Sequence, residues 1–224
     1  EEMLELAAAG AKVLHIRSVE YARRHGVTLH VRSSFTNDEG TIVYDPERAG
    51  STMEEPMIVG VAHDLSEAKV TVVGVPDVPG TAARIFTIVA ETGANVDMIV
   101  QNVSEAATGR TDISFTLPKE EAGGVLQALE SHRSDVGFAS LQHDDQIGKL
   151  ALVGAGMRTN AGVSARLFKA LSDAGINIEM ISTSEIRISV VTRADQLVDA
   201  VRVVHTAFEL DGDDEAVVHA GTGR

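Results

Sequence analysis

The chain has 224 residues, of which 44% are hydrophobic, a composition that predicts one large or two small folded domains rather than a disordered polypeptide. Its 33 acidic residues outnumber its 19 basic ones, giving a formal net charge of −14 that argues against nucleic acid as a partner, because neutralising phosphates requires clustered Lys and Arg. Cysteine is absent, which excludes disulfides and thiolate metal sites, and no apolar run reaches the roughly 18 residues of a membrane span, so we expect a cytoplasmic protein with no membrane partner.

The first segment, residues 1–50, resembles the end of an α/β domain. Apolar residues at helical spacing predict one helix before Gly10 and a second, capped by Ser18, that ends at Gly26. The run "VTLHVRSS", which begins at Val27, alternates apolar and polar residues and predicts a strand. Residues 51–56 lie in a polar stretch without periodicity and are the expected linker.

An internal repeat dominates the rest of the chain. Residues 79–102 and 161–184 agree at eight positions when they are overlaid at a constant offset: Gly80/Gly162, Ala83/Ala165, Arg84/Arg166, Phe86/Phe168, Gly93/Gly175, Asn95/Asn177, Met98/Met180 and Ile99/Ile181. We therefore expect two modules of the same fold, one over residues 57–143 and one over residues 144–224.

Each copy shows the same order of patterns. A short apolar strand, "KVTVVGV" or "KLALVGA", precedes an amphipathic helix, two alternating strands and a second helix. The run "VGFASLQ", residues 136–142, supplies the closing strand of the first copy. The order is βαββαβ, which predicts an α+β fold of two ferredoxin-like modules, each with two helices on one face of a four-stranded antiparallel sheet.

Two apolar strands remain outside this order. One is "MIVGVAH", residues 57–63, before the first copy, and the other is "EAVVHAG", residues 215–221, at the end of the second. We expect one or both to complete the sheet of the other module, so that the modules are interlocked.

Three functions fit the residues poorly. An RNA-binding sheet would display exposed aromatic residues, yet the chain has only 6 Phe and 2 Tyr. A nicotinamide-dinucleotide site at "LVGAGMRTNAG" lacks its third glycine, because Thr159 stands in its place. No catalytic residue and no metal ligand set is expected, since the eight histidines form no His-Glu-x-x-His pattern and no serine lies in a nucleophile elbow.

A small-molecule sensor fits better. In each copy a loop delivers backbone N–H groups at the start of a helix, where a carboxylate is attracted. Asp77 in the first loop could hold an ammonium group, and Asn160 replaces it in the second. Polar residues end the neighbouring strands, among them Gln101 and Asn102 in the first copy and Thr183 and Ser184 in the second. These groups together suit a free amino acid, although Asp77 and Asn160 could instead cap their helices.

Several longer runs carry a family resemblance. "VPDVPGTAARIF", "NVDMIVQNVS", "ISTSEIRIS" and the ending "DDEAVVHAGTGR" closely resemble the C-terminal regulatory region of bacterial aspartokinases, which consists of paired ACT domains. Residues 4–35 resemble the last part of the amino-acid-kinase domain of the same enzymes. An ACT-like amino-acid sensor of another enzyme is the alternative.

The resemblance implies a function, partners and site residues. Aspartokinases phosphorylate aspartate with ATP and Mg²⁺ on the way to lysine, threonine and methionine. Their lysine-and-glycine catalytic motif has no counterpart here, so we expect this chain alone to be inactive and to hold no cofactor.

The implied effectors are threonine and lysine, bound for feedback inhibition, and the implied partners are a second copy, paired through the ACT modules, and the catalytic subunit. The implied effector site of the first module consists of Asp77, Pro79, Gly80, Thr81, Ala82, Gln101 and Asn102, and that of the second consists of Asn160, Gly162, Val163, Ser164, Asn177, Ile178, Thr183 and Ser184.

Overall fold

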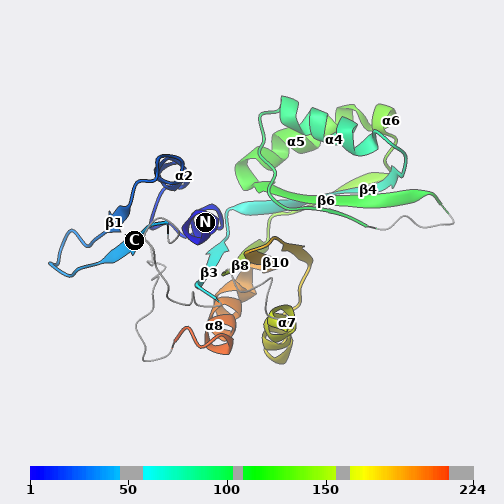
Figure 1. Ribbon diagram of the computed structural model, residues 1–224. Coiled ribbons are helices and arrows are strands. Elements are labelled where there is room, and N and C mark those ends of the chain that lie inside the picture. Colours follow the sequence, from blue (N-terminus) through cyan, green and yellow to red (C-terminus); the bar gives the residue numbers. More distant parts are fainter. Residues whose placement is uncertain (46–57, 103–107, 155–161, 212–224) are drawn as a thin grey trace.

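The computed structural model describes residues 1–45, 58–102, 108–154 and 162–211 (Figure 1). The N-terminal segment contains helices α1 (Glu2–Ala8) and α2 (Ile16–His25) and an antiparallel hairpin of β1 (Leu29–Val31) and β2 (Thr41–Val43). Helix α2 ends at Gly26 in a left-handed conformation, as predicted. The prediction that Ser18 caps this helix is wrong, because the N-cap residue is His15, three residues earlier, and its ring accepts the N–H of Arg17.

The first module is a four-stranded antiparallel sheet in the order β5-β6-β4-β7, covered on one face by helices. Its strands are β4 (Glu67–Pro76), β5 (Ile99–Gln101), β6 (Arg110–Pro118) and β7 (Ser140–Asp144), and its helices are α4 (Thr81–Glu91), α5 (Lys119–Ser131) and the single turn α6 (Arg133–Val136). The closing strand begins later than predicted, because residues 133–136 form α6 and Gly137 ends it with a positive φ.

The second module has the sheet order β3-β8-β10-β9. Its elements are β3 (Gly60–Asp64), β8 (Ile147–Val153), α7 (Val163–Asp173), β9 (Met180–Thr183), β10 (Arg187–Arg193), the 3-10 turn η2 (Ala194–Gln196) and α8 (Leu197–Ala207). Strand β3 precedes the first module in the chain but pairs antiparallel with β8. The two modules are therefore interlocked. The other spare run, residues 215–221, and the linker, residues 51–56, lie outside the described residues.

Each module has its own apolar core between sheet and helices. In the first, Phe115 and Leu117 of β6 pack with Ile85 and Val89 of α4, all of them fully buried. In the second, side chains at the equivalent places of β8, β10, α7 and α8 do the same. The alternation of apolar residues along each strand thus marks the face that the helices cover.

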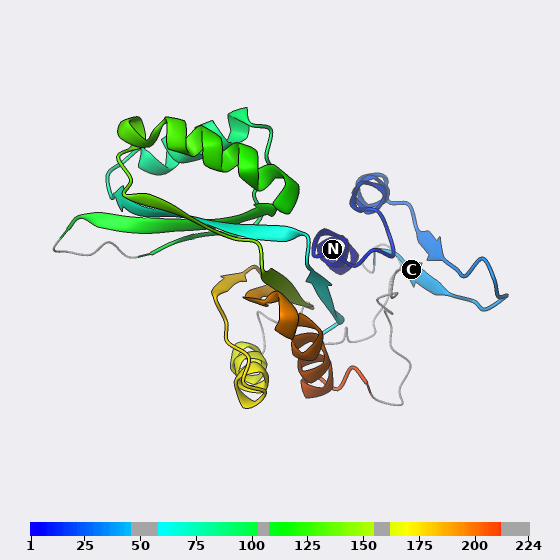
Figure 2. The same cartoon turned by 180° about the vertical axis from the view of Figure 1, so that it is seen from behind.

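The other faces of the two sheets are turned toward each other. Both views show α4, α5 and α6 on one outer side and α7 and α8 on the other, with the sheets between them (Figures 1 and 2). Met98, Ile147, Met180 and Val191 form a small apolar cluster between the modules. Leu6 of α1 and Ala9, the C-cap residue of this helix, pack on β3 and β8 of the second sheet. Strand β8 is therefore buried on both faces, and all seven of its residues are buried.

Candidate ligand-binding site

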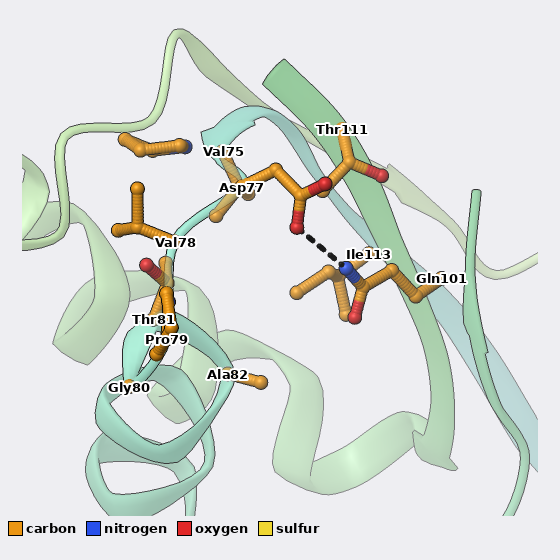
Figure 3. Close-up of a pocket in the computed structure, with 11 residues that line it drawn as sticks. Val75, Asp77, Val78, Pro79, Gly80, Thr81, Ala82, Gln101, Thr111 and Ile113 are labelled. Carbon is orange, nitrogen blue, oxygen red and sulfur yellow. Dashed lines mark hydrogen bonds between the residues drawn. The ribbon is translucent and has the colours of Figure 1, made fainter. Parts of the chain in front are cut away.

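A pocket of about 350 Å³ lies where β4 leads into α4 (Figure 3). Its volume is near the lower limit of the roughly 300–1,000 Å³ typical of small-molecule sites. It is lined by Val75, Pro76, Asp77, Val78, Pro79, Gly80, Thr81, Ala82, Gln101, Thr111 and Ile113. Six of the seven residues implied for the first site are among them. The loop 77–80 and the end of β5, 24 positions apart at Asp77 and Gln101, thus meet in one pocket.

The polar groups of the pocket face one another. Figure 3 shows the carboxylate of Asp77 and the amide of Gln101 pointing toward each other, and the amide nitrogen donates to Asp77 Oδ1 over 3.5 Å. Both residues are exposed, and the hydrogen bond is long, so the two groups remain accessible to a third polar partner. The backbone N–H of Asp77 donates to Gly109, which holds the loop against the start of β6.

The first turn of α4 forms the opposite wall. Gly80 is its N-cap residue with φ 95°, a left-handed conformation that L side chains adopt at a cost. Within the described part of the chain no side chain caps the helix, so the alternative role of Asp77 as a helix cap is not observed. Because the first N–H groups of a helix have no intrahelical acceptor, this end of α4 carries partial positive charge toward the pocket.

The remaining residue of the first set lies beside the pocket rather than in it. Asn102 follows β5, where its N–H donates to Asp112 and its carbonyl accepts the hydroxyl of Thr111. It fixes Thr111, which does line the pocket and is almost completely buried. Thr111 was not anticipated from the sequence, although its place at the start of the strand that pairs with β5 was a usable signal.

The second set of residues is only partly described. Gly162 is the N-cap residue of α7 with φ 101°, the counterpart of Gly80, and Ser164 is exposed in the first turn while Val163 is buried. Thr183 ends β9 and Ser184 follows it, whereas Asn177 and Ile178 precede this strand and therefore lie at its other end. Asn160 lies outside the described residues.

Two further properties bear on ligand class. Within the described ranges, no group of three or more His, Asp or Glu side chains is arranged to hold a metal ion. Nor does any described helix combine the length and apolar character that crossing a bilayer requires.

Comparisons with known proteins agree with this architecture. The family model described as "ACT domain" matches residues 70–132 and 150–208, one match in each module. The chain is 54% identical over all 224 residues to the aspartokinase of Mycobacterium tuberculosis, of which it covers 53%. It is 51% identical to the aspartokinase of Corynebacterium glutamicum over 228 aligned positions, again covering 53% of that protein. The chain thus spans about half the length of the curated relatives it matches.

A solved structure gives the same result. The regulatory subunit of aspartate kinase from Thermus thermophilus superposes with a TM-score of 0.64 at 41% identity, over 68% of this chain and 99% of that one. The match therefore covers nearly the whole of that regulatory subunit. Together, the full-length identity and the two ACT matches, one in each module of the structure, show that the chain belongs to the aspartokinase family and carries its paired ACT domains.

Proposed function

We propose that the chain is the allosteric regulatory part of an aspartokinase, and that free threonine, with lysine as a second effector, binds it to inhibit the enzyme. The proposal combines membership of the family with one structural observation. Six residues that the family resemblance implies for an amino-acid site line a single pocket, with a carboxylate on one side and a helix N-terminus on the other.

The chemistry of the pocket suits an α-amino acid. Asp77 supplies a negative charge for the ammonium group, and the first turn of α4 attracts the carboxylate. In an α-amino acid the ammonium and carboxylate groups are attached to the same carbon atom. A small pocket with a carboxylate on one wall and a helix N-terminus on the other therefore favours a ligand of this kind. Gln101 can exchange its long hydrogen bond to Asp77 for one to a polar ligand side chain such as the hydroxyl of threonine.

The second module offers a related but weaker site. Gly162 and Ser164 present the same helix start, but the loop carries Asn160 where the first has Asp77. An amide supplies no charge for the ammonium group, so we expect unequal affinities at the two sites and assign the tighter one to the first module.

The proposal includes two protein partners. A second copy of the chain is expected to pair through the edge strands β5 and β9, which carry Ile99 and Ile181 at equivalent positions with 50% and 43% of their surface exposed. The catalytic domain of an aspartokinase is the other partner. It supplies the ATP and Mg²⁺ sites, and the chain described here is expected to have no kinase activity alone.

Calorimetric titration with each of the twenty amino acids, with NADH and with an oligonucleotide tests the proposal. We expect binding heat for threonine or lysine. In an unfolding experiment, a ligand concentration of 100 times the dissociation constant should raise the free energy of unfolding by about 2.7 kcal/mol. Binding of NADH without binding of threonine or lysine would favour a dinucleotide site and contradict the proposal.

A further inference from the structure

Five charged side chains of alternating sign connect all three parts of the molecule. We call them the charge chain: Glu67 of β4, Lys149 of β8, Asp97 before β5, Arg187 of β10 and Glu5 of α1. Glu67 and Asp97 belong to the first module, Lys149 and Arg187 to the second, and Glu5 to the N-terminal segment. No residue of the charge chain belongs to the candidate ligand-binding site.

Lys149 is the fixed centre of this arrangement. Its side chain is 2% exposed, and its Nζ contacts Glu67 and lies 2.6 Å from Asp97 Oδ2. Burial alone would lower the pKa of Lys149, but the two carboxylates outweigh it and raise the pKa above its usual value. Lys149 therefore stays charged and needs at least one carboxylate partner in place at all times.

Asp97 stands between two cations at unequal distances. Its other oxygen, Oδ1, lies 4.0 Å from Arg187, which in turn lies 3.2 Å from Glu5. The Nε of Arg187 is buried without a hydrogen-bond partner among the described residues. Arg187 thus has unused donor capacity, and a small movement of Asp97 toward it would complete a pair that is now loose.

Asp97 is also tied mechanically to the pocket. It lies two residues before β5, a strand of three residues at the edge of its sheet, and the other end of this strand is Gln101 of the pocket. The backbone N–H of Asp97 donates to Thr116 of β6, and Met98 makes two hydrogen bonds with the same threonine. The pairing of β5 with β6 therefore continues through Met98 and Asp97 as one hydrogen-bonded edge segment, and we expect a displacement of Gln101 to be carried along it to Asp97.

We propose that the charge chain transmits occupancy of the first pocket to helix α1, with Arg187 as the positioning residue that changes partner. This inference rests on the proposed function. When a ligand takes the amide of Gln101 from Asp77, β5 shifts, Asp97 closes on Arg187, and Arg187 loosens its hold on Glu5. Lys149 keeps Glu67 throughout, so no cation is left buried and unpaired in either arrangement. Helix α1 belongs to the segment that resembles the kinase domain. The weaker ion pair between Arg187 and Glu5 is therefore the change that reaches that segment.

Hydrogen exchange followed by mass spectrometry on this chain tests the proposal. In the parent, threonine should slow exchange in the peptides that cover residues 75–82 and 99–101 and speed it in the peptide that covers α1. In Arg187→Gln, we expect the pocket peptides to respond as in the parent, threonine affinity to stay within about threefold, and the response of α1 to be lost. Glu5→Gln should behave in the same way, and because this residue is partly exposed on a short helix it serves if Arg187→Gln does not fold.

The chain offers a matched control on the same strand. Arg193 of β10 bridges the modules through Asp144 of β7 at 2.7 Å and lies 3.8 Å from Glu179 of its own module, but none of its ion pairs in the described structure reaches α1. Arg193→Gln should therefore leave the response of α1 intact. An α1 response that persists in both Arg187→Gln and Glu5→Gln, or is missing in a parent that binds threonine, would overturn this inference alone. A parent that binds neither threonine nor lysine would overturn the proposed function and the inference with it.

Discussion

Ala82 is the residue at which the ligand charge can be tested without disturbing the backbone. It is exposed in the first turn of α4 and lines the pocket. Gly80 is a poorer choice, because any other residue there would have to adopt φ 95°. The effect of backbone strain on binding could then not be separated from the effect of the added charge. An acidic residue in a first helical turn is by contrast favourable to the helix.

We expect Ala82→Asp to weaken threonine binding at least tenfold while the protein keeps its stability. Two like charges 4 Å apart repel by about 4 kcal/mol at an effective dielectric constant of about 20, and a third of that value suffices for a tenfold loss. Titration calorimetry measures the affinity and thermal unfolding measures the stability. Ala82→Asn controls for size, and Ser164→Asp places the same charge at the second module. Unchanged affinity in Ala82→Asp would mean that the carboxylate does not bind at this helix.

Lys149 carries a prediction about stability. Lys149→Met removes the cation shared by Glu67 and Asp97, and Glu67 Oε2 already lacks a hydrogen-bond partner among the described residues. Two carboxylates left without their cation should lower the free energy of unfolding by about 3–5 kcal/mol. Because the pKa of Lys149 is raised in the folded state, its contribution is complete below the unfolded pKa of about 10.4 and is lost as the pH rises through the folded pKa. Urea unfolding of parent and variant between pH 7 and 11 checks this: the difference between them should shrink only at the alkaline end.

At the scale of elements, the exposed edges of the two sheets carry the dimer prediction. Among the described residues, strands β5 and β9 each have one unpaired edge, and each presents an exposed isoleucine. A lysine on an edge strand discourages pairing with another chain. We expect sedimentation at tens of micromolar to show a dimer for the parent and a monomer for the double variant Ile99→Lys, Ile181→Lys. Val198→Lys, an equally exposed position on α8, should remain dimeric. A monomeric parent, with and without threonine, would contradict the assignment.

The elements themselves were largely predictable, because local pattern determines them. Alternating apolar residues marked the strands and amphipathic spacing marked the helices, so the repeat led directly to two βαββαβ modules. Strand β3 was one of two spare runs expected to complete the sheet of the other module, and it does pair with β8; the apolar run "MIVGVAH" does not by itself reveal which strand it joins. The burial of Lys149 was equally hidden: a lysine before an apolar run usually marks a strand end, and only the packing of two sheets places carboxylates around it. Thr111 entered the pocket through the pairing of β6 with β5, so the predicted strand pairing, and not the spacing of residues along the chain, was the signal that could have found it.

At the scale of the whole molecule, interlocking predicts unfolding in one transition. Strand β3, the apolar cluster between the sheets and the charge chain all join the modules, so neither can lose its structure without exposing the other. Scanning calorimetry should give a calorimetric enthalpy close to the van't Hoff enthalpy. Val61→Asp, which puts a carboxylate into the second core through β3, should lower this single transition as a whole. Two transitions, of which only one responds to Val61→Asp, would show instead that the modules are independent.

The place of β3 also sets an order of events during synthesis. Ala62 of β3 pairs with Ala151 of β8, roughly 90 residues later in the chain. At about 5–20 residues per second, a ribosome needs roughly 5–18 s to deliver the partner strand, far longer than helices and hairpins take to form. During that interval β3 has an apolar face and no sheet to join. The helices and strands of the first module are thus made beside an unpaired strand, and the interlocked pair can close only when β8 returns to a segment made long before it.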